Sequence, residues 1–553
     1  MKSIFTAISF FALVILFAVP SKTFAQTSDT VWVAATPVGN INDFISGDTT
    51  ATGARVNPNR VYKLHRDSIF FFTGTIKANF HLTLIAGKGN GALPVIEPAI
   101  LPDNSRPSTF INLLSGGLTF KQLYLLGIAP DELPLGNGIA INIAGDSMKI
   151  KVDSCIFDGW SERAFSAGGK NNGYWITDNI FRNHQSYTAW LWGDAWISLS
   201  NIPTDTVYFA NNTMYCNNSY ALAIVYYNKY LVFNHNTIFL TDGNPLWLFN
   251  LTNGVITNNI FYGVETAAEV KAELHSGRFD SDGQIVSIIS FDTLTTVASN
   301  YGIKEAQRKI KVDNNVYFWP QSIKDFWKSI NDTASATDSL ITPEWMNSRT
   351  QNIFTNKTTW PNFEASNNVN VNPGFSASME DRAISSFLHY VYLIRSNGLG
   401  SYLWWYNPTG SVYPPTQPVP ENLAYSNTSL QSAGTDGFAL GDLNWFPEQH
   451  NQWLVTDVKK EKGFAPTEYS LDQNYPNPFN PSTVISYSIQ KEGNVSLKVF
   501  NILGQEVNTL VNKVQTAGSY KVSFNANSLC SGVYFYTLST NGFMQTKKMM
   551  LLK

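Results

Sequence analysis

Basic side chains that could do acid–base chemistry gather in one stretch of the chain, at Arg163, Lys170 and Arg182. A lysine or arginine can remove the proton beside a uronate carboxyl group, the step that begins a polysaccharide lyase reaction. That step also calls for a group that neutralises the carboxylate, a role that Ca²⁺ can fill. These three residues are therefore candidate catalytic groups. No cofactor is required by a residue pattern here, and Ca²⁺ is the possible one.

Carboxylates in the same stretch offer a second chemistry. Asp158, Asp178 and Asp194 could supply the paired acids of a glycoside hydrolase, and His184 is a further basic candidate. Simpler explanations compete, because either arginine can be an ordinary surface residue and Asp178 fits a structural repeat described below. If the protein is an enzyme, the basic set favours a lyase over a hydrolase, but the sequence leaves catalysis itself open.

Aromatic residues follow these groups and could bind sugar rings. Alternation in a strand places Trp190 and Trp192 on one side and Leu191 on the other, and Tyr226 and Trp247 lie in comparable segments. If the aromatic side faces solvent, these four rings form an exposed ridge on which the apolar faces of sugars can pack. The alternative, which is favoured for any single ring, is that it fills the core.

The segment that must position these groups repeats itself. A five-residue pattern ending in an aromatic residue occurs as DSCIF, TDNIF, NNTMY, HNTIF, TNNIF and DNNVY. The aromatic residues are separated by 24, 34, 24, 22 and 56 positions: Phe157, Phe181, Tyr215, Phe239, Phe261 and Tyr317. Three residues before each stands a polar residue: Ser154, Asp178, Asn212, Asn236, Asn258 and Asn314. A solenoid would stack these positions into an aromatic column and an amide ladder, whereas turn chemistry is the alternative for the Asn residues.

The repeat of roughly 22–24 residues resembles that of the right-handed parallel β-helix, in which each coil carries three short strands. A leucine-rich repeat would need a recurring LxxLxL framework and a propeller would need blades of about 40 residues, and neither pattern recurs. Segments 59–72, 81–87 and 94–97 resemble the opening coils of pectate-lyase-like β-helices. The expected fold is all-β: a right-handed parallel β-helix over residues 26–455, with an N-terminal cap, loop insertions and an irregular closing segment.

The sequence shows no clear pattern for a metal site or for a disulfide framework. The chain has 3 Cys and 7 His, without the CxxC or HxxxH spacing of a zinc site. The segment Asp280-Ser281-Asp282-Gly283 has some features of a calcium loop but falls far short of an EF-hand. Cys155 and Cys216 stand about two coils apart in the repeat, which predicts that they do not form a disulfide.

Both ends of the chain predict export. An apolar run from Ile4 to Val19 and small residues before Gln26 are typical of a signal peptide, residues 1–25. Residues 466–553 contain YPNPFNP, NILGQEV and GVY, followed by two adjacent lysines near the end. They closely resemble the type A C-terminal sorting domain of the type IX secretion system, a small Ig-like β-sandwich, which a linker at 456–465 would join to the β-helix. The resemblance implies that residues 466–553 bind the type IX secretion machinery and that the protein is extracellular or on the outer-membrane surface.

Composition narrows the range of partners. Charged residues make up 14% of the chain and the formal net charge is −3, which argues against a nucleic-acid partner, since that needs a basic surface. No segment after the signal peptide is apolar enough to span a membrane. Glu265, Glu269 and Glu273 have the spacing of an exposed stripe on a short helix. We therefore expect either an exported β-helix that binds or processes extracellular polysaccharide, or a non-catalytic adhesive or structural surface protein.

Overall fold

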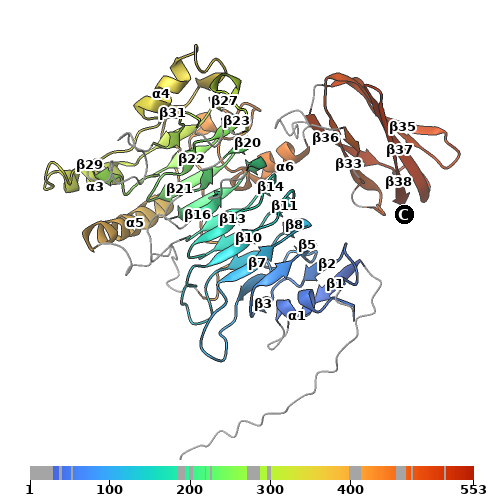
Figure 1. Cartoon of the computed structure of the whole chain (residues 1–553), viewed down its shortest axis with the longest axis horizontal. Helices are drawn as coiled ribbons and strands as arrows, with labels where there is room; N and C mark the ends of the chain where they lie inside the picture. The colour runs from blue at the N-terminus through green and yellow to red at the C-terminus, as the bar shows by residue number, and fades with distance from the viewer. Residues whose placement is uncertain are drawn as a thin grey trace, which may run out of the picture.

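The computed structural model describes residues 29–35, 40–50, 54–184, 194–198, 203–217, 220–224, 227–270, 287–294, 301–397, 413–455, 469–471, 473–474, 477–515 and 518–552. Within this part, the segment between residues 30 and 370 winds into a solenoid with three parallel sheets along its sides (Figure 1). Each complete coil contributes one strand to each sheet in turn. The expected parallel β-helix is confirmed.

The three sheets are named here by the number of their described strands. The eleven-stranded sheet contains β1 (Thr30–Val33), β2 (Val61–Leu64), β5 (His81–Ala86), β8 (Gly117–Lys121), β11 (Lys149–Asp153), β14 (Gly173–Thr177), β17 (Thr204–Ala210), β20 (Asn228–Asn234), β23 (Leu251–Thr257), β27 (Lys309–Asp313) and β30 (Phe363–Ser366). The ten-stranded sheet contains β3 (Ile69–Phe72), β6 (Val95–Pro98), β9 (Tyr124–Leu126), β12 (Ile156–Asp158), β15 (Ile180–Arg182), β18 (Thr213–Asn217), β21 (Thr237–Thr241), β24 (Ile260–Tyr262), β28 (Val316–Phe318) and β31 (Val369–Asn370). The eight-stranded sheet contains β4 (Ile76–Ala78), β7 (Thr109–Leu113), β10 (Ile139–Ile143), β13 (Arg163–Ala167), β16 (Asp194–Ser198), β19 (Leu222–Ile224), β22 (Leu246–Leu248) and β26 (Ile289–Ser290).

The aromatic column inside the solenoid differs from the predicted one in two coils. Phe157 and Phe181 lie opposite each other, and their rings stack with centroids 5.1 Å apart. In the next coil Phe181 pairs with Met214 rather than with Tyr215. Tyr215 and the equivalent Phe239 therefore stack with each other at 5.1 Å on the opposite face of the sheet.

The prediction was wrong by one residue in these coils because each has a threonine between its Asn and its apolar residue. Thr213 and Thr237 push the closing aromatic residue one position along the strand. Successive residues of a strand point to opposite faces, so a shift of one residue moves the ring from the core to the outside. Phe375 packs edge-on against Phe239 with ring centroids 5.4 Å apart, and both Tyr215 and Phe239 remain buried.

An amide ladder does run along the turn between the eleven-stranded and ten-stranded sheets. From Asn212 onward, each side-chain oxygen accepts both the backbone N–H and the side-chain NH₂ of the Asn one coil earlier, at 2.8–3.2 Å. The oxygen of the first member accepts the backbone N–H of Cys155 at 2.9 Å. The members of the ladder are Asn179, Asn212, Asn236, Asn259, Asn315 and Asn368. Only two of the predicted positions are therefore right. Ser154, Asp178, Asn258 and Asn314 instead occupy a neighbouring turn position with φ between 53° and 61°, where Asn and Asp are tolerated.

Short helices and a long return segment complete this domain. Helix α1 (Ile41–Ser46) buries Ile41 and Ile45 against the first coils, and α4 (Ser348–Thr355) buries Ile353 and Phe354 near the last. Helices α3 (Gln321–Asn331) and α5 (Ala377–Asn397) contact each other, and β25 (Glu269–Val270) pairs with β29 (Leu340–Ile341). Residues 413–455, here called the closing strap, then run back along the outer face of the ten-stranded sheet and end in α6 (Pro447–Val455).

The described residues from 469 onward form two antiparallel sheets with a hydrophobic core of their own. One sheet contains β32 (Ser470–Leu471), β33 (Ser482–Ile489) and β36 (Gly518–Asn525). The other contains β34 (Gly493–Phe500), β35 (Glu506–Gln515), β37 (Gly532–Thr540) and β38 (Phe543–Leu551). The predicted small β-sandwich is confirmed.

Candidate functional site

The structure does not bring the three basic candidates together. Arg163 lies on the eight-stranded sheet, largely buried, with its guanidinium 3.0 Å from Glu162. Lys170 is an exposed residue in the turn between the eight-stranded and eleven-stranded sheets, where its backbone N–H donates to Asp146. Arg182 lies on the ten-stranded sheet. The candidates thus occupy different sides of the solenoid.

Arg182 belongs to a buried ion cluster. Its guanidinium lies 2.6 Å from Asp158 on the preceding coil and donates to Glu421 of the closing strap at 2.7 Å. Tyr124 donates a further hydrogen bond to Asp158 at 2.6 Å. Burial disfavours the charged guanidinium, but the two carboxylates outweigh it and raise the pKa of Arg182. The surface position considered for both arginines is therefore wrong, because Glu421, distant in sequence, folds back over Arg182.

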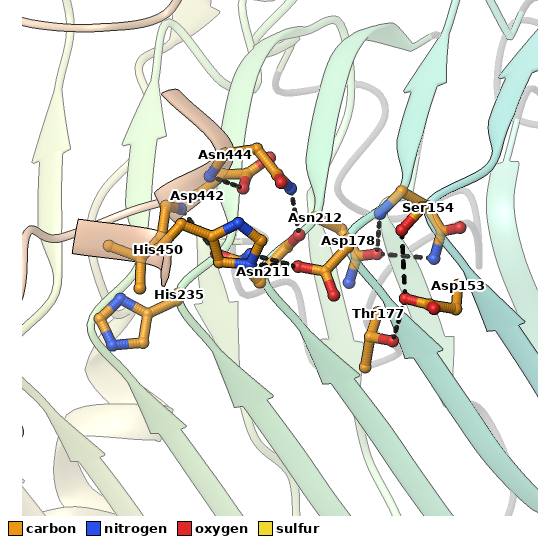
Figure 2. A network of polar contacts seen from close by, with 12 residues as sticks. Asp153, Ser154, Thr177, Asp178, Asn211, Asn212, His235, Asp442, Asn444 and His450 are labelled. Carbon is orange, nitrogen blue, oxygen red and sulfur yellow. Dashed lines mark hydrogen bonds and ion pairs between the residues drawn. The ribbon is translucent and has the colours of Figure 1, made fainter. Parts of the chain in front are cut away.

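A second polar network ties the strap to the turns that precede the ten-stranded sheet, as Figure 2 shows. Asp178 accepts a hydrogen bond from Asn211 and lies 3.0 Å from His450 of α6. Asp442 accepts from the Thr213 hydroxyl at 2.7 Å, and burial raises the pKa of Asp442 to about 7. These carboxylates hold the strap in place, so a structural role accounts for Asp178.

Three buried polar side chains at or just after the ends of strands in the ten-stranded sheet lack, among the described residues, hydrogen-bond partners that would offset the cost of their burial. His184, Asn217 and Glu265 are at most 5% exposed, and none of their side-chain nitrogen or oxygen atoms has a hydrogen-bond partner of good geometry in the described part of the chain. Burial lowers the pKa of His184 to about 4, against smaller opposing effects of Asp158 and the Phe157 carbonyl. Burial, together with the nearby Glu269, raises the pKa of Glu265. Unpaired buried groups are rare in proteins and costly. His184 was a basic candidate and Glu265 part of the predicted acidic stripe, but no sequence pattern indicated Asn217 or the burial of these side chains.

The acidic helix predicted around Glu265 is not formed in the described residues. Glu265 lies in a turn after β24 with φ of 55°, and Glu269 begins the short strand β25. Both carboxylates are buried, because α3 packs over the turn. The indole N–H of Trp327 in this helix donates a hydrogen bond to the Thr266 carbonyl at 2.8 Å. The four-residue spacing of Glu265 and Glu269, which suggested a helical stripe, arises here from a turn followed by a short strand. Glu273 lies outside the described residues.

The aromatic ridge is described at one of its four positions. Trp247 points outward from β22, between the buried Leu246 and Leu248. Its ring stacks on Tyr220 at 5.1 Å and meets Phe249 edge-on at 5.0 Å. Trp190, Trp192 and Tyr226 lie outside the described residues, as does the side chain of Asp194.

The structure describes both cysteines for which a disulfide was considered, and it describes part of the residues considered for metal binding. Cys155 and Cys216 are both buried, free thiols. Within the described ranges, no group of three His, Cys, Asp or Glu side chains is arranged to hold a metal ion. The acidic segment 280–283 lies outside these ranges, so the structure does not bear on a calcium site there.

Comparison with known families agrees with both halves of this architecture. The family model "Right handed beta helix region" matches residues 137–316, and the model "Secretion system C-terminal sorting domain" matches residues 473–552. The chain therefore carries a right-handed β-helix and a type IX secretion sorting domain, and it is exported to the cell surface or beyond. No helix in the described residues is both long and apolar enough to cross a bilayer.

Comparison with individual proteins adds little. No curated protein matches the chain. Among solved structures, the Ig1 domain of mouse SynCAM 2 is similar at 20% identity, over 13% of this chain and 80% of that one, with a TM-score of 0.10. The endo-beta-1,4-mannanase from Thermotoga petrophila is similar at 9% identity, with a TM-score of 0.11. That match covers 55% of this chain and less than half, 47%, of the mannanase chain.

Proposed function

We propose that this exported β-helix binds extracellular polysaccharide on the outer face of its eight-stranded sheet. The observation that carries the proposal is the position of Trp247, which projects from this face and is held there by Tyr220 and Phe249. Trp247 is half-buried, so part of its ring remains open to solvent. An aromatic ring fixed in this way offers an apolar surface to the C–H face of a sugar without losing side-chain freedom on binding.

Polar side chains continue this face toward the N-terminus of the solenoid. The Asn142 side chain donates to Asn112 on the preceding coil at 3.2 Å, and Ser166 follows in register on the next coil. Amide and hydroxyl groups of this kind can exchange hydrogen bonds with sugar hydroxyls. Trp190, Trp192 and Tyr226 remain proposed members of the same ridge.

The test is affinity electrophoresis of the mature chain through gels that contain neutral or uronate-bearing polysaccharides. Trp247→Ala should weaken retention by the recognised polysaccharide roughly five- to tenfold, the equivalent of about 1–1.5 kcal/mol of aromatic contact. Tyr392→Ala is the matched control, because Tyr392 is 52% exposed on α5, outside the eight-stranded and eleven-stranded sheets. Equal retention of both variants and the wild type would reject this binding face.

Polysaccharide cleavage is the second candidate, in which Arg163, Lys170 or Arg182 would act singly as the base, because the three lie on different sides of the solenoid. Incubation with uronate-containing polysaccharides and Ca²⁺ would release unsaturated ends that absorb ultraviolet light. A flat trace across the panel would reject the lyase form of the proposal. The buried ion pairs of Arg182 favour binding over cleavage, because a guanidinium held by two carboxylates is poorly placed to remove a proton.

A further inference from the structure

The outer face of the eleven-stranded sheet carries a second set of aromatic residues. Trp175 on β14 lies opposite Tyr208 on β17, and Tyr230 on β20 lies opposite Thr206. All three rings are half-buried and alternate with core residues along their strands. Trp175 and Tyr208 are in register on adjacent strands, which lie about 4.8 Å apart. Tyr230 lies one coil further on and two residues earlier along its strand, so the three aromatic residues are spread over three successive coils.

The Trp175 ring is held flat against the sheet. A Cβ atom at Gly173 would come within 2.7 Å of the ring, so the ring lies over the glycine in space that any other residue would fill. The ammonium group of Lys149 stands 6.0 Å from the ring centroid, at the limit of a cation–π contact. Gly173 therefore fixes the ring in an orientation that presents its face to a ligand.

The same face is basic in a chain that is acidic overall. Seven lysines lie on its strands: Lys63, Lys121, Lys149, Lys151, Lys229, Lys309 and Lys311. Four acids lie with them: Asp153, Asp205, Asp313 and Glu364. Seven minus four leaves a surplus of three positive charges, whereas the whole chain has a formal net charge of −3. Three of the acids are already paired with lysines of this face, at 2.5–3.2 Å.

We propose that this face binds an anionic polysaccharide, one that carries uronate or sulfate groups, laid along the solenoid axis. The three aromatic residues would take the sugar rings and the flanking lysines would take the acidic groups, with a spacing set by the coils. The inference deepens the proposed function by adding a second face with a charge preference. It stands apart from the Trp247 face, which is on a different sheet.

The experiment is a titration of the mature chain with polygalacturonate, a neutral galactomannan and duplex DNA, at two salt concentrations. Trp175→Ala and the double variant Lys149→Gln/Lys151→Gln should each weaken polygalacturonate binding about tenfold, and added salt should weaken it further. Gly173→Ala should have a similar effect by tilting the ring, while circular dichroism shows that each variant is folded. Trp247→Ala should leave polygalacturonate binding to this face unchanged.

Two results would overturn the proposal. Unchanged polygalacturonate binding in both Trp175→Ala and the lysine variant would show that this face is not used. Binding of duplex DNA with equal affinity would show a general attraction for polyanions rather than recognition of sugar. Failure of Trp247→Ala to affect galactomannan retention would count only against the eight-stranded sheet, so the two proposals fail separately.

Discussion

Removing one amide from the Asn ladder should destabilise the solenoid far more than removing a neighbouring polar side chain. The Asn236 side chain is fully buried and makes four hydrogen bonds, two from Asn212, one to the Phe209 carbonyl and one to Asn259, all at 3.0–3.1 Å. Each bond contributes about 1 kcal/mol, and an orphaned buried donor costs more. Asn236→Ala should therefore lower the free energy of unfolding by about 4 kcal/mol.

The matched control is Ser154→Ala, at the neighbouring turn position. The Ser154 hydroxyl makes one long hydrogen bond, 3.3 Å to Asp153, so its loss should change the free energy of unfolding by about 0.5 kcal/mol or less. Urea unfolding followed by tryptophan fluorescence isolates the solenoid, because all 15 Trp precede residue 456. If Asn236→Ala costs no more than Ser154→Ala, the ladder does not hold the coils together and the reasoning fails.

Three further predictions concern buried charge. Burial raises the pKa of Glu97 to about 7. Between pH 4.5 and 7 the folded state therefore keeps a proton that the unfolded state loses. The free energy of unfolding should fall by up to about 3 kcal/mol over this range. Glu97→Gln should remove this slope, match the wild type at pH 4.5 and exceed it at pH 8; parallel curves would contradict the assignment. Arg182→Met should cost about 3–5 kcal/mol by leaving two carboxylates unpaired and should expose the closing strap to limited proteolysis, whereas Lys170→Met should do neither. Glu265→Gln should raise the melting temperature at pH 8 more than at pH 5, since the raised pKa of Glu265 makes its ionised form unfavourable in the fold; an equal change at both values would refute this.

Local repetition made the solenoid predictable from sequence, but not its exact register. The recurring polar, aliphatic and aromatic residues indicate one coil each. An aromatic residue nevertheless looks the same in sequence whether it faces inward, as Phe181 does, or outward, as Tyr215 does. The face depends on the count of residues from the ladder Asn, and one inserted threonine reverses it.

Partners distant in sequence explain the remaining errors. The environment of Arg182 depends on Glu421, and that of Asp178 on His450. Glu265 is buried by a helix that begins more than fifty residues later. No local pattern encodes these contacts. The buried Tyr174 directly precedes the outward Trp175, so residue type alone does not mark the aromatic face of the eleven-stranded sheet.

The most direct test of the central claim is titration calorimetry of the mature chain with a panel of neutral and uronate-bearing polysaccharides. Saturable binding of at least one of them, weakened five- to tenfold by Trp247→Ala and unchanged by Tyr392→Ala, is the predicted result. The absence of heat with every polysaccharide would contradict polysaccharide binding and favour an adhesive or structural surface protein.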